Sequence, residues 1–209
     1  MKKPILLIVT ILCFSLSISA QVNFYIASGV NLSNISQEIN NEKISGLSNG
    51  SLVSPFLSIG AATPILDKLY LFGEISYSPQ GYQNDVFPPD GPPTAQKTKY
   101  DYLNVMPGLA YQINPVRFEI GGFVGYSLSE KIKFMDGWSE DLDFIDELNV
   151  GAFAGINIIL FKELSIFSRY YYGLASVLEL NITDFDGNPA GIYAEKTRTL
   201  QVGLSFGLD

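Results

Sequence analysis

The chain has 209 residues, with 21 acidic and 13 basic side chains and a formal net charge of −8. This excess of negative charge excludes nucleic acid as a partner, because phosphates require a positive protein surface. The length suits one domain of ordinary size. Charged residues make up only 16% of the chain, well below the share of about 25% that is typical of soluble domains.

The first twenty residues have the pattern of a secretory signal peptide. Two lysines precede an apolar stretch at 4–14, and small polar residues lead to Ala20. The apolar stretch is too short for a membrane-spanning helix, which needs about 20 residues. We therefore expect cleavage after Ala20 and one mature domain at 21–209. The only cysteine, Cys13, lies in the predicted signal peptide, so disulfide bonds are not expected.

Eight segments alternate between apolar and polar residues, which predicts β-strands. In the segment 69–78, for example, Ile75 and Tyr77 lie on one face, and Glu74 and Ser76 lie on the other. The eight segments cover approximately 22–33, 51–62, 69–78, 102–112, 116–127, 147–160, 164–177 and 199–206.

The two faces of these segments indicate which environment each one meets. One face is apolar, whereas the other is small, mostly uncharged and rich in glycine, serine and asparagine. A soluble sandwich would have a charged outer face. The pattern instead favours a small-residue face that lines a narrow lumen and an apolar face in contact with lipid. Outward aromatic residues predict two interfacial girdles: Phe24, Tyr111 and Phe206 on the turn side, and Tyr77, Tyr126 and Tyr172 on the loop side.

Long and short connections alternate along the chain. The long ones cover about 34–50, 82–97, 129–146 and 178–194, and the short ones lie at 63–64, 114–115 and 161–163. Outer-membrane barrels have this asymmetry, with short periplasmic turns and long extracellular loops. The sequence thus predicts an all-β protein, an eight-stranded antiparallel up-and-down transmembrane β-barrel in a bacterial outer membrane, with both termini periplasmic. A soluble barrel of the lipocalin type is the alternative.

Four short motifs resemble strands of the PorT-type outer-membrane β-barrel family. The chain carries GVNLS at 29–33, YLNVMP at 102–107, GFVGYSLSEK at 122–131 and RYYYGL at 169–174. These are similar to the family's first strand and to its YLEIP, GPYVGYLLSAK and RYxxGL strands, with Met106 as an extra residue before the proline. The resemblance implies one eight-stranded barrel. It also implies a role like that of its members, some of which are linked to protein export to the cell surface and many of which are called porin-like.

No catalytic, cofactor or metal site is expected. The chain contains no histidine, so none of its serines has an imidazole base, and neither histidine nor mature cysteine is available to hold zinc. The stretch DFDGN at 184–188 has some likeness to a calcium-binding loop. An EF-hand alignment, however, puts Ile182 and Tyr193 at positions one and twelve, where acidic ligands are required. We therefore do not expect an enzyme.

Four charged residues fall on the lumen-facing side: Glu74, Arg117, Glu119 and Arg169. Isolated charges in a dry lumen are costly, so the four are expected to form a compensating ion cluster that plugs the barrel. The alternative is a gated polar path for small solutes. Eight strands favour the plug, because they leave an interior only wide enough for side chains.

The third long connection is acidic and contains the one tryptophan; its candidate interaction residues are Trp138, Glu140, Asp141 and Asp143. A solvated surface is the simple interpretation. The functional interpretation is cation bridging to lipopolysaccharide phosphates, or docking of a partner. The leading hypothesis is thus a structural or interaction barrel that meets outer-membrane lipid, lipopolysaccharide and other envelope proteins. The alternatives are a passive small-solute porin and a soluble ligand-binding barrel.

Overall fold

The computed structural model describes residues 22–44, 50–86, 94–134, 137–140, 148–183 and 186–208. The predicted signal peptide lies outside these ranges, as do Asp141 and Asp143. Among the described residues, no helix is both long and apolar enough to cross a membrane.

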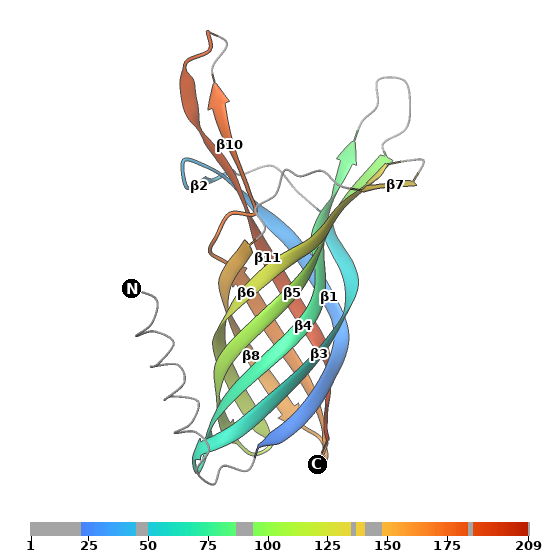
Figure 1. Ribbon diagram of the computed structural model, residues 1–209, viewed down its shortest axis with the longest axis vertical. Helices are drawn as coiled ribbons and strands as arrows, with labels where there is room; N and C mark the ends of the chain where they lie inside the picture. The colour runs from blue at the N-terminus through green and yellow to red at the C-terminus, as the bar shows by residue number, and fades with distance from the viewer. Residues whose placement is uncertain are drawn as a thin grey trace, which may run out of the picture.

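Eight long strands form a closed barrel (Figure 1). They are β1 (Asn23–Ile39), β3 (Gly50–Leu66), β4 (Leu69–Val86), β5 (Thr94–Ile113), β6 (Val116–Phe134), β8 (Leu148–Ile159), β9 (Leu164–Gly173) and β11 (Pro189–Gly207). Each strand pairs antiparallel with the next, and β11 pairs with β1, so that Gly29 lies opposite Gly203 and the ring closes. Closure leaves no unpaired edge in the wall, and the eight-stranded up-and-down architecture predicted from the sequence is confirmed.

Strands continue into segments that the sequence predicted to be loops. Three short strands, β2 (Glu42–Lys43), β7 (Gly137–Glu140) and β10 (Leu178–Thr183), lie at the end of the barrel with the long connections, which we call the loop end. β10 pairs with the upper part of β11 and forms the tall hairpin of Figure 1. The predicted loops were too long because polar residues can extend a strand outside the membrane, where hydrophobic alternation is no longer required.

Two of the three predicted short turns are confirmed, and one is displaced. The chain turns at 114–115 and bends at 161–163, at the end of the barrel that we call the turn end. The turn predicted at Thr63 and Pro64 is wrong: β3 continues to Leu66, and the turn is formed by Asp67 and Lys68. Pro64 is accommodated near the strand end, where the register with β4 shifts between Pro64 and Leu66.

The apolar face of the strands points outward, as predicted. Leu57 and Ile120 are 61% and 63% exposed, whereas their inward neighbours Ser58 and Glu119 are buried. All six predicted girdle residues are between 42% and 54% exposed. Because this surface is apolar all round the barrel, the soluble alternative is not supported, and the wall suits contact with acyl chains.

Candidate functional site

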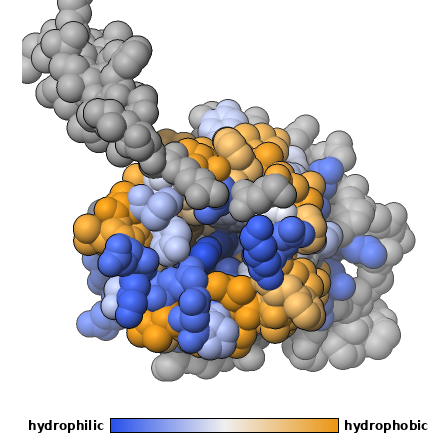
Figure 2. All heavy atoms as spheres, turned by 90° about the horizontal axis from the view of Figure 1, so that it is seen from below, coloured by the Kyte–Doolittle hydropathy of each residue, from blue (hydrophilic) through white to orange (hydrophobic). Residues whose placement is uncertain are grey.

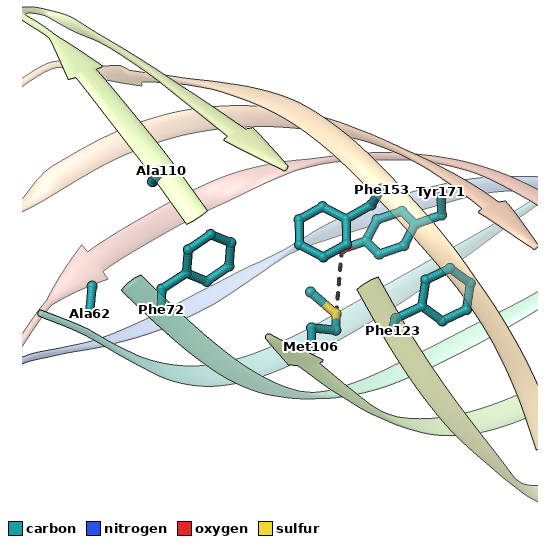
Figure 3. Packing of buried hydrophobic residues seen from close by; sticks show 7 residues of the cluster. All are labelled: Ala62, Phe72, Met106, Ala110, Phe123, Phe153 and Tyr171. Atoms are coloured by element: carbon teal, nitrogen blue, oxygen red, sulfur yellow. Dashed lines mark hydrogen bonds between the residues drawn. The ribbon is translucent and has the colours of Figure 1, made fainter. Parts of the chain in front are cut away.

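The lumen is filled by side chains, beginning with a layer of aromatic rings in its middle (Figure 3). The rings of Phe153 and Phe123 lie 5.4 Å and 5.6 Å from that of Tyr171, between centroids. The Tyr171 hydroxyl oxygen lies 3.6 Å from the Met106 sulfur. The layer comprises Ala62, Phe72, Met106, Ala110, Phe123, Phe153 and Tyr171.

Glycines of the lumen face make room for these rings. A Cβ atom on Gly121 would lie 2.7 Å from Cζ of Phe153, and one on Gly60 would lie 2.3 Å from Cζ of Tyr25. Both distances are shorter than any van der Waals contact of a real Cβ atom. Each ring can therefore occupy its position only because the residue that faces it is glycine. The prediction that small residues line the lumen is therefore only part of the arrangement, because large aromatic rings occupy the space that the glycines leave.

Arg169 is the centre of a buried ion cluster. Its Nη1 donates to Oε2 of Glu74 at 2.8 Å, and its Nε donates to Oε2 of Glu119 at 2.7 Å. The Tyr25 hydroxyl also donates to Oε2 of Glu74, at 3.0 Å. The guanidinium lies 4.6 Å from the ring centroid of Phe167. A buried charge is tolerable only with such partners, so this cluster fixes four strands relative to one another.

Arg117 does not join that cluster. Its Nε and Nη2 donate to Oε1 of Gln112 at 3.2 Å and 2.8 Å, and its guanidinium lies 5.0 Å from the ring centroid of Tyr70. Gln112 and Arg117 face each other across the β5–β6 turn, so this local contact forms instead. The structure thus brings together Glu74, Glu119 and Arg169, with one positive and two negative charges. The fourth predicted lumen residue lies nearer the turn end.

A network of neutral polar side chains also occupies the lumen. The Gln201 amide donates to Oδ1 of Asn31 at 3.0 Å, and Asn31 donates to Oγ of Ser78 at 2.9 Å. The Tyr171 hydroxyl donates to Oε1 of Gln201 at 3.0 Å and so connects this network to the aromatic layer. The sequence pattern does not predict these residues as a site, because amides and hydroxyls on a polar face do not indicate their partners.

Toward the loop end, a third layer covers the network. The chain leaves β9 at Gly173 and not at 177 as predicted, and Val177 is fully buried against Tyr100 and Tyr102 of β5. The Val177 amide donates to the Glu195 carbonyl at 2.7 Å, which holds this segment against β11. The lumen is therefore closed by an apolar contact near the loop end as well as by the aromatic layer.

Beyond this layer lie two buried carboxylates, Glu130 and Glu195. Among the described side chains of β6 the last exposed large apolar residue is Leu128, and on β11 the partly exposed positions between Glu195 and Leu200 are the charged Lys196 and Arg198. We therefore place both glutamates outside the membrane-spanning part. Burial and the neighbouring Glu195 carboxylate raise the pKa of Glu130 to about 7. One oxygen of each, Oε2, is buried without a hydrogen-bond partner in the part of the chain that the structure describes.

The predicted loop interaction site is described only in part. Trp138 and Glu140 belong to β7, where they pair with Lys133 and Lys131 of β6 along the backbone. Their side chains, like Asp141 and Asp143, lie outside the description, so the interaction site stays a prediction. Within the described ranges, no group of three or more histidine, cysteine, aspartate or glutamate residues is arranged to hold a metal ion.

A closed ring of eight strands with an apolar outer surface and a filled lumen defines an integral membrane β-barrel. The chain belongs to the outer membrane protein beta-barrel domain family, whose model matches residues 17–179. It is accordingly an outer-membrane β-barrel protein.

Solved structures with a similar course of the chain have low sequence identity to it. Neisserial surface protein A has 12% identity and a TM-score of 0.49, over 89% of this chain and 98% of that one. OprG from Pseudomonas aeruginosa has 12% identity and a TM-score of 0.45, over 90% and 97%. Ail of Yersinia pestis, in complex with the heparin analogue sucrose octasulfate, has 14% identity and a TM-score of 0.41, over 89% and 99%. A search among curated proteins found no significant match.

Proposed function

We propose that this barrel is a structural or interaction protein of the bacterial outer membrane with a closed lumen, and that its loop end meets partners at the cell surface. The observation that carries the proposal is the filled lumen. The Arg169 ion cluster, the aromatic layer and the contact of Val177 with Tyr100 follow one another along the barrel. A barrel of eight strands leaves little room besides these side chains.

The orientation of the proposed barrel follows from its two ends. The turn end has short connections, and the loop end has the tall β10–β11 hairpin and the longer connections (Figure 1). Outer-membrane barrels keep short turns in the periplasm, so we place the termini in the periplasm and the loop end outside. The acidic third connection then faces lipopolysaccharide, whose phosphates it would meet through divalent cations.

The proposed role is not enzymatic. The chain has no histidine, and the buried Arg169 cluster already uses its charges on one another. The resemblance to PorT-type barrels supports membership of a surface-export assembly, in which the protein would act as a subunit.

Affinity purification from outer membranes tests the interaction role. The full chain carries a tag on an extracellular connection, and mild cross-linking precedes solubilisation. We expect a reproducible set of envelope proteins that is absent when the same tag is placed on an unrelated barrel of equal abundance. Recovery of the barrel alone from cross-linked membranes would contradict a subunit role.

The porin alternative predicts a different result in liposomes. A closed lumen predicts that proteoliposomes swell no faster than empty ones in arabinose or in amino acids. Swelling that depends on the protein and falls with solute size would replace the interaction role with passive uptake.

A further inference from the structure

Side chains close the lumen in its middle and toward the loop end, but they leave part of it open at the turn end. A cavity of about 140 Å³ opens there, with the Arg169–Glu119 ion pair at its inner end. Viewed from this end, hydrophilic residues line a hollow, and hydrophobic residues lie around much of its rim (Figure 2). The barrel thus has a pocket that is accessible from one side of the membrane and closed on the other by the aromatic layer.

Arg117, in the wall of this pocket, carries a charge without a carboxylate partner. Its contacts among the described residues are two hydrogen bonds to the neutral Gln112 amide and the stacking on Tyr70. Nη1 has no hydrogen-bond partner among the described residues and keeps two N–H donors. The charge is partly buried, which strengthens its interaction with any anion that enters.

The same wall contains acceptors without donors. Oδ1 of Asn157 and Oδ1 of Asn23 are both buried without a hydrogen-bond partner in the described ranges. Asn157 is itself 5% exposed. Both oxygens have almost no accessible surface, so a molecule in the pocket reaches them after a small rotation of the amide groups. Its N–H or O–H donors would then satisfy acceptors that are otherwise costly to bury. The pocket is therefore complementary to a molecule with both an anionic end and a donor end.

The remaining walls limit the size and charge of that molecule. Tyr25, Tyr70 and Phe72 supply flat apolar sides. Glu119 and the exposed Glu163 in the wall disfavour an anion with two charges, whereas the exposed Lys162 adds one positive charge. The guanidinium of Arg117 suits a planar carboxylate. The volume of about 140 Å³ has space for only a few heavy atoms.

We propose that the turn-end pocket binds a small monocarboxylate with an adjacent hydrogen-bond donor, that is, a short hydroxy acid or amino acid. Arg117 holds the carboxylate, and the Asn157 and Asn23 amides accept from the donor. The barrel then has a solute-binding site that faces the periplasm in the proposed orientation, although its lumen does not conduct.

Titration of the refolded full chain in detergent micelles tests the site, with glycolate, glycine, acetate and inorganic phosphate as probes. NMR chemical shifts report binding, including the shift of the Arg117 Nε–H signal. We expect saturable binding of glycolate or glycine, at least about tenfold weaker binding of acetate, and none of phosphate. Arg117→Gln should weaken glycolate binding at least about tenfold, a loss of about 1.4 kcal/mol.

Lys68→Gln is the matched control, because it removes one positive charge at the same end of the barrel outside the pocket. It should leave glycolate binding unchanged. Heat-modifiable migration in gels verifies that each variant is folded. If Arg117→Gln does not fold, Asn157→Leu supplies the second variant and should abolish the preference for glycolate over acetate. The proposal is overturned if no probe binds the folded wild type, if Arg117→Gln and Lys68→Gln behave alike, or if acetate binds as well as glycolate.

Discussion

Arg169 and Glu130 are both buried inside the barrel wall, but their surroundings differ. Arg169 lies among two carboxylates and an aromatic ring, with Nη1 and Nε each bonded to a carboxylate at 2.8 Å and 2.7 Å. Glu130 has another carboxylate, Glu195, as its neighbour, and its Oε2 has no partner among the described residues. The Arg169 guanidinium therefore stays charged, whereas the Glu130 carboxyl releases and takes up a proton near neutral pH.

The contrast shows that a narrow lumen can hold both a permanently charged group and a group whose charge changes with pH. At membrane depth the one positive charge of Arg169 lies between two carboxylates, where little water is available to solvate any of the three groups. Outside the membrane-spanning part, nearby solvent makes an incompletely compensated acid tolerable.

The largest effect is expected from Arg169→Met. Loss of the guanidinium leaves Glu74 and Glu119 buried without their common partner, and the free energy of unfolding should fall by about 3–5 kcal/mol. Urea titration in lipid vesicles, followed by intrinsic fluorescence, measures this. The triple variant with Glu74→Gln and Glu119→Gln should recover part of the loss. An Arg169→Met protein as stable as wild type would show that the cluster does not stabilise the barrel.

A second prediction concerns the fit between rings and glycines. Gly60→Ala puts a Cβ atom about where the Tyr25 ring lies, 2.3 Å from its Cζ, and should cost about 1–3 kcal/mol through overpacking. The same substitution in a Tyr25→Ala background should cost much less, since the clash is with that side chain. Equal costs in both backgrounds, measured by a double-mutant cycle, would rule out the proposed contact.

Two asparagines of the lumen that are both fully buried, Asn149 and Asn104, give a third comparison. Asn149 donates to Oγ1 of Thr197 at 3.0 Å, whereas neither amide atom of Asn104 has a partner in the described part of the chain. Asn149→Leu should destabilise by about 1–3 kcal/mol, because Thr197 loses its partner. Asn104→Leu should be neutral or stabilising. Similar losses at both positions in urea titrations would mean that Asn104 is bonded as well, for example to internal water.

The smallest effect concerns pH. Because the pKa of Glu130 is raised to about 7, the folded state binds more protons than the unfolded state between the ordinary carboxyl pKa and 7. Its contribution to stability is full below about pH 4.5 and is lost as pH rises through 7. After allowance for solvent screening, this amounts to about 1 kcal/mol.

Glu130→Gln should therefore flatten the stability profile between pH 5 and pH 8, as measured by urea titration at each pH. Glu179→Gln, an exposed glutamate on the β10 hairpin, serves as the control and should keep the wild-type slope. An unchanged slope in Glu130→Gln would assign the pH dependence to another group.

The sequence predicted those parts of the structure that depend on period-two alternation. Ile75 and Glu74 have opposite environments in a barrel of any size. The alternation therefore predicted which face of each strand points outward and that the strands form a barrel. The partners of Arg117 were not, because a register that puts Gln112 opposite Arg117 depends on the exact turn. A balanced group of four charges was predicted, but the chain forms a three-residue cluster and one separate arginine.

Extensions beyond the membrane were also difficult to predict. Residues of β10 and of the upper part of β11 have lost the strict apolar alternation, and they form strands because their backbones pair with each other. The inward course of Val177 depends on its contact with Tyr100 and Tyr102, far away in the sequence. Such long-range packing leaves no periodic signal.

The central claim is that the apolar stripe of each strand contacts lipid while its neighbours fill the lumen. Cys13 is the only cysteine and lies in the predicted signal peptide, so single cysteines can be introduced along β5 and labelled with nitroxides in lipid vesicles. We predict that labels at Val105 and Leu109 are mobile and relaxed by oxygen dissolved in the bilayer, whereas labels at Asn104 and Ala110 are immobile and protected. Lipid access at Asn104 and Ala110, with Val105 and Leu109 protected, would contradict the account.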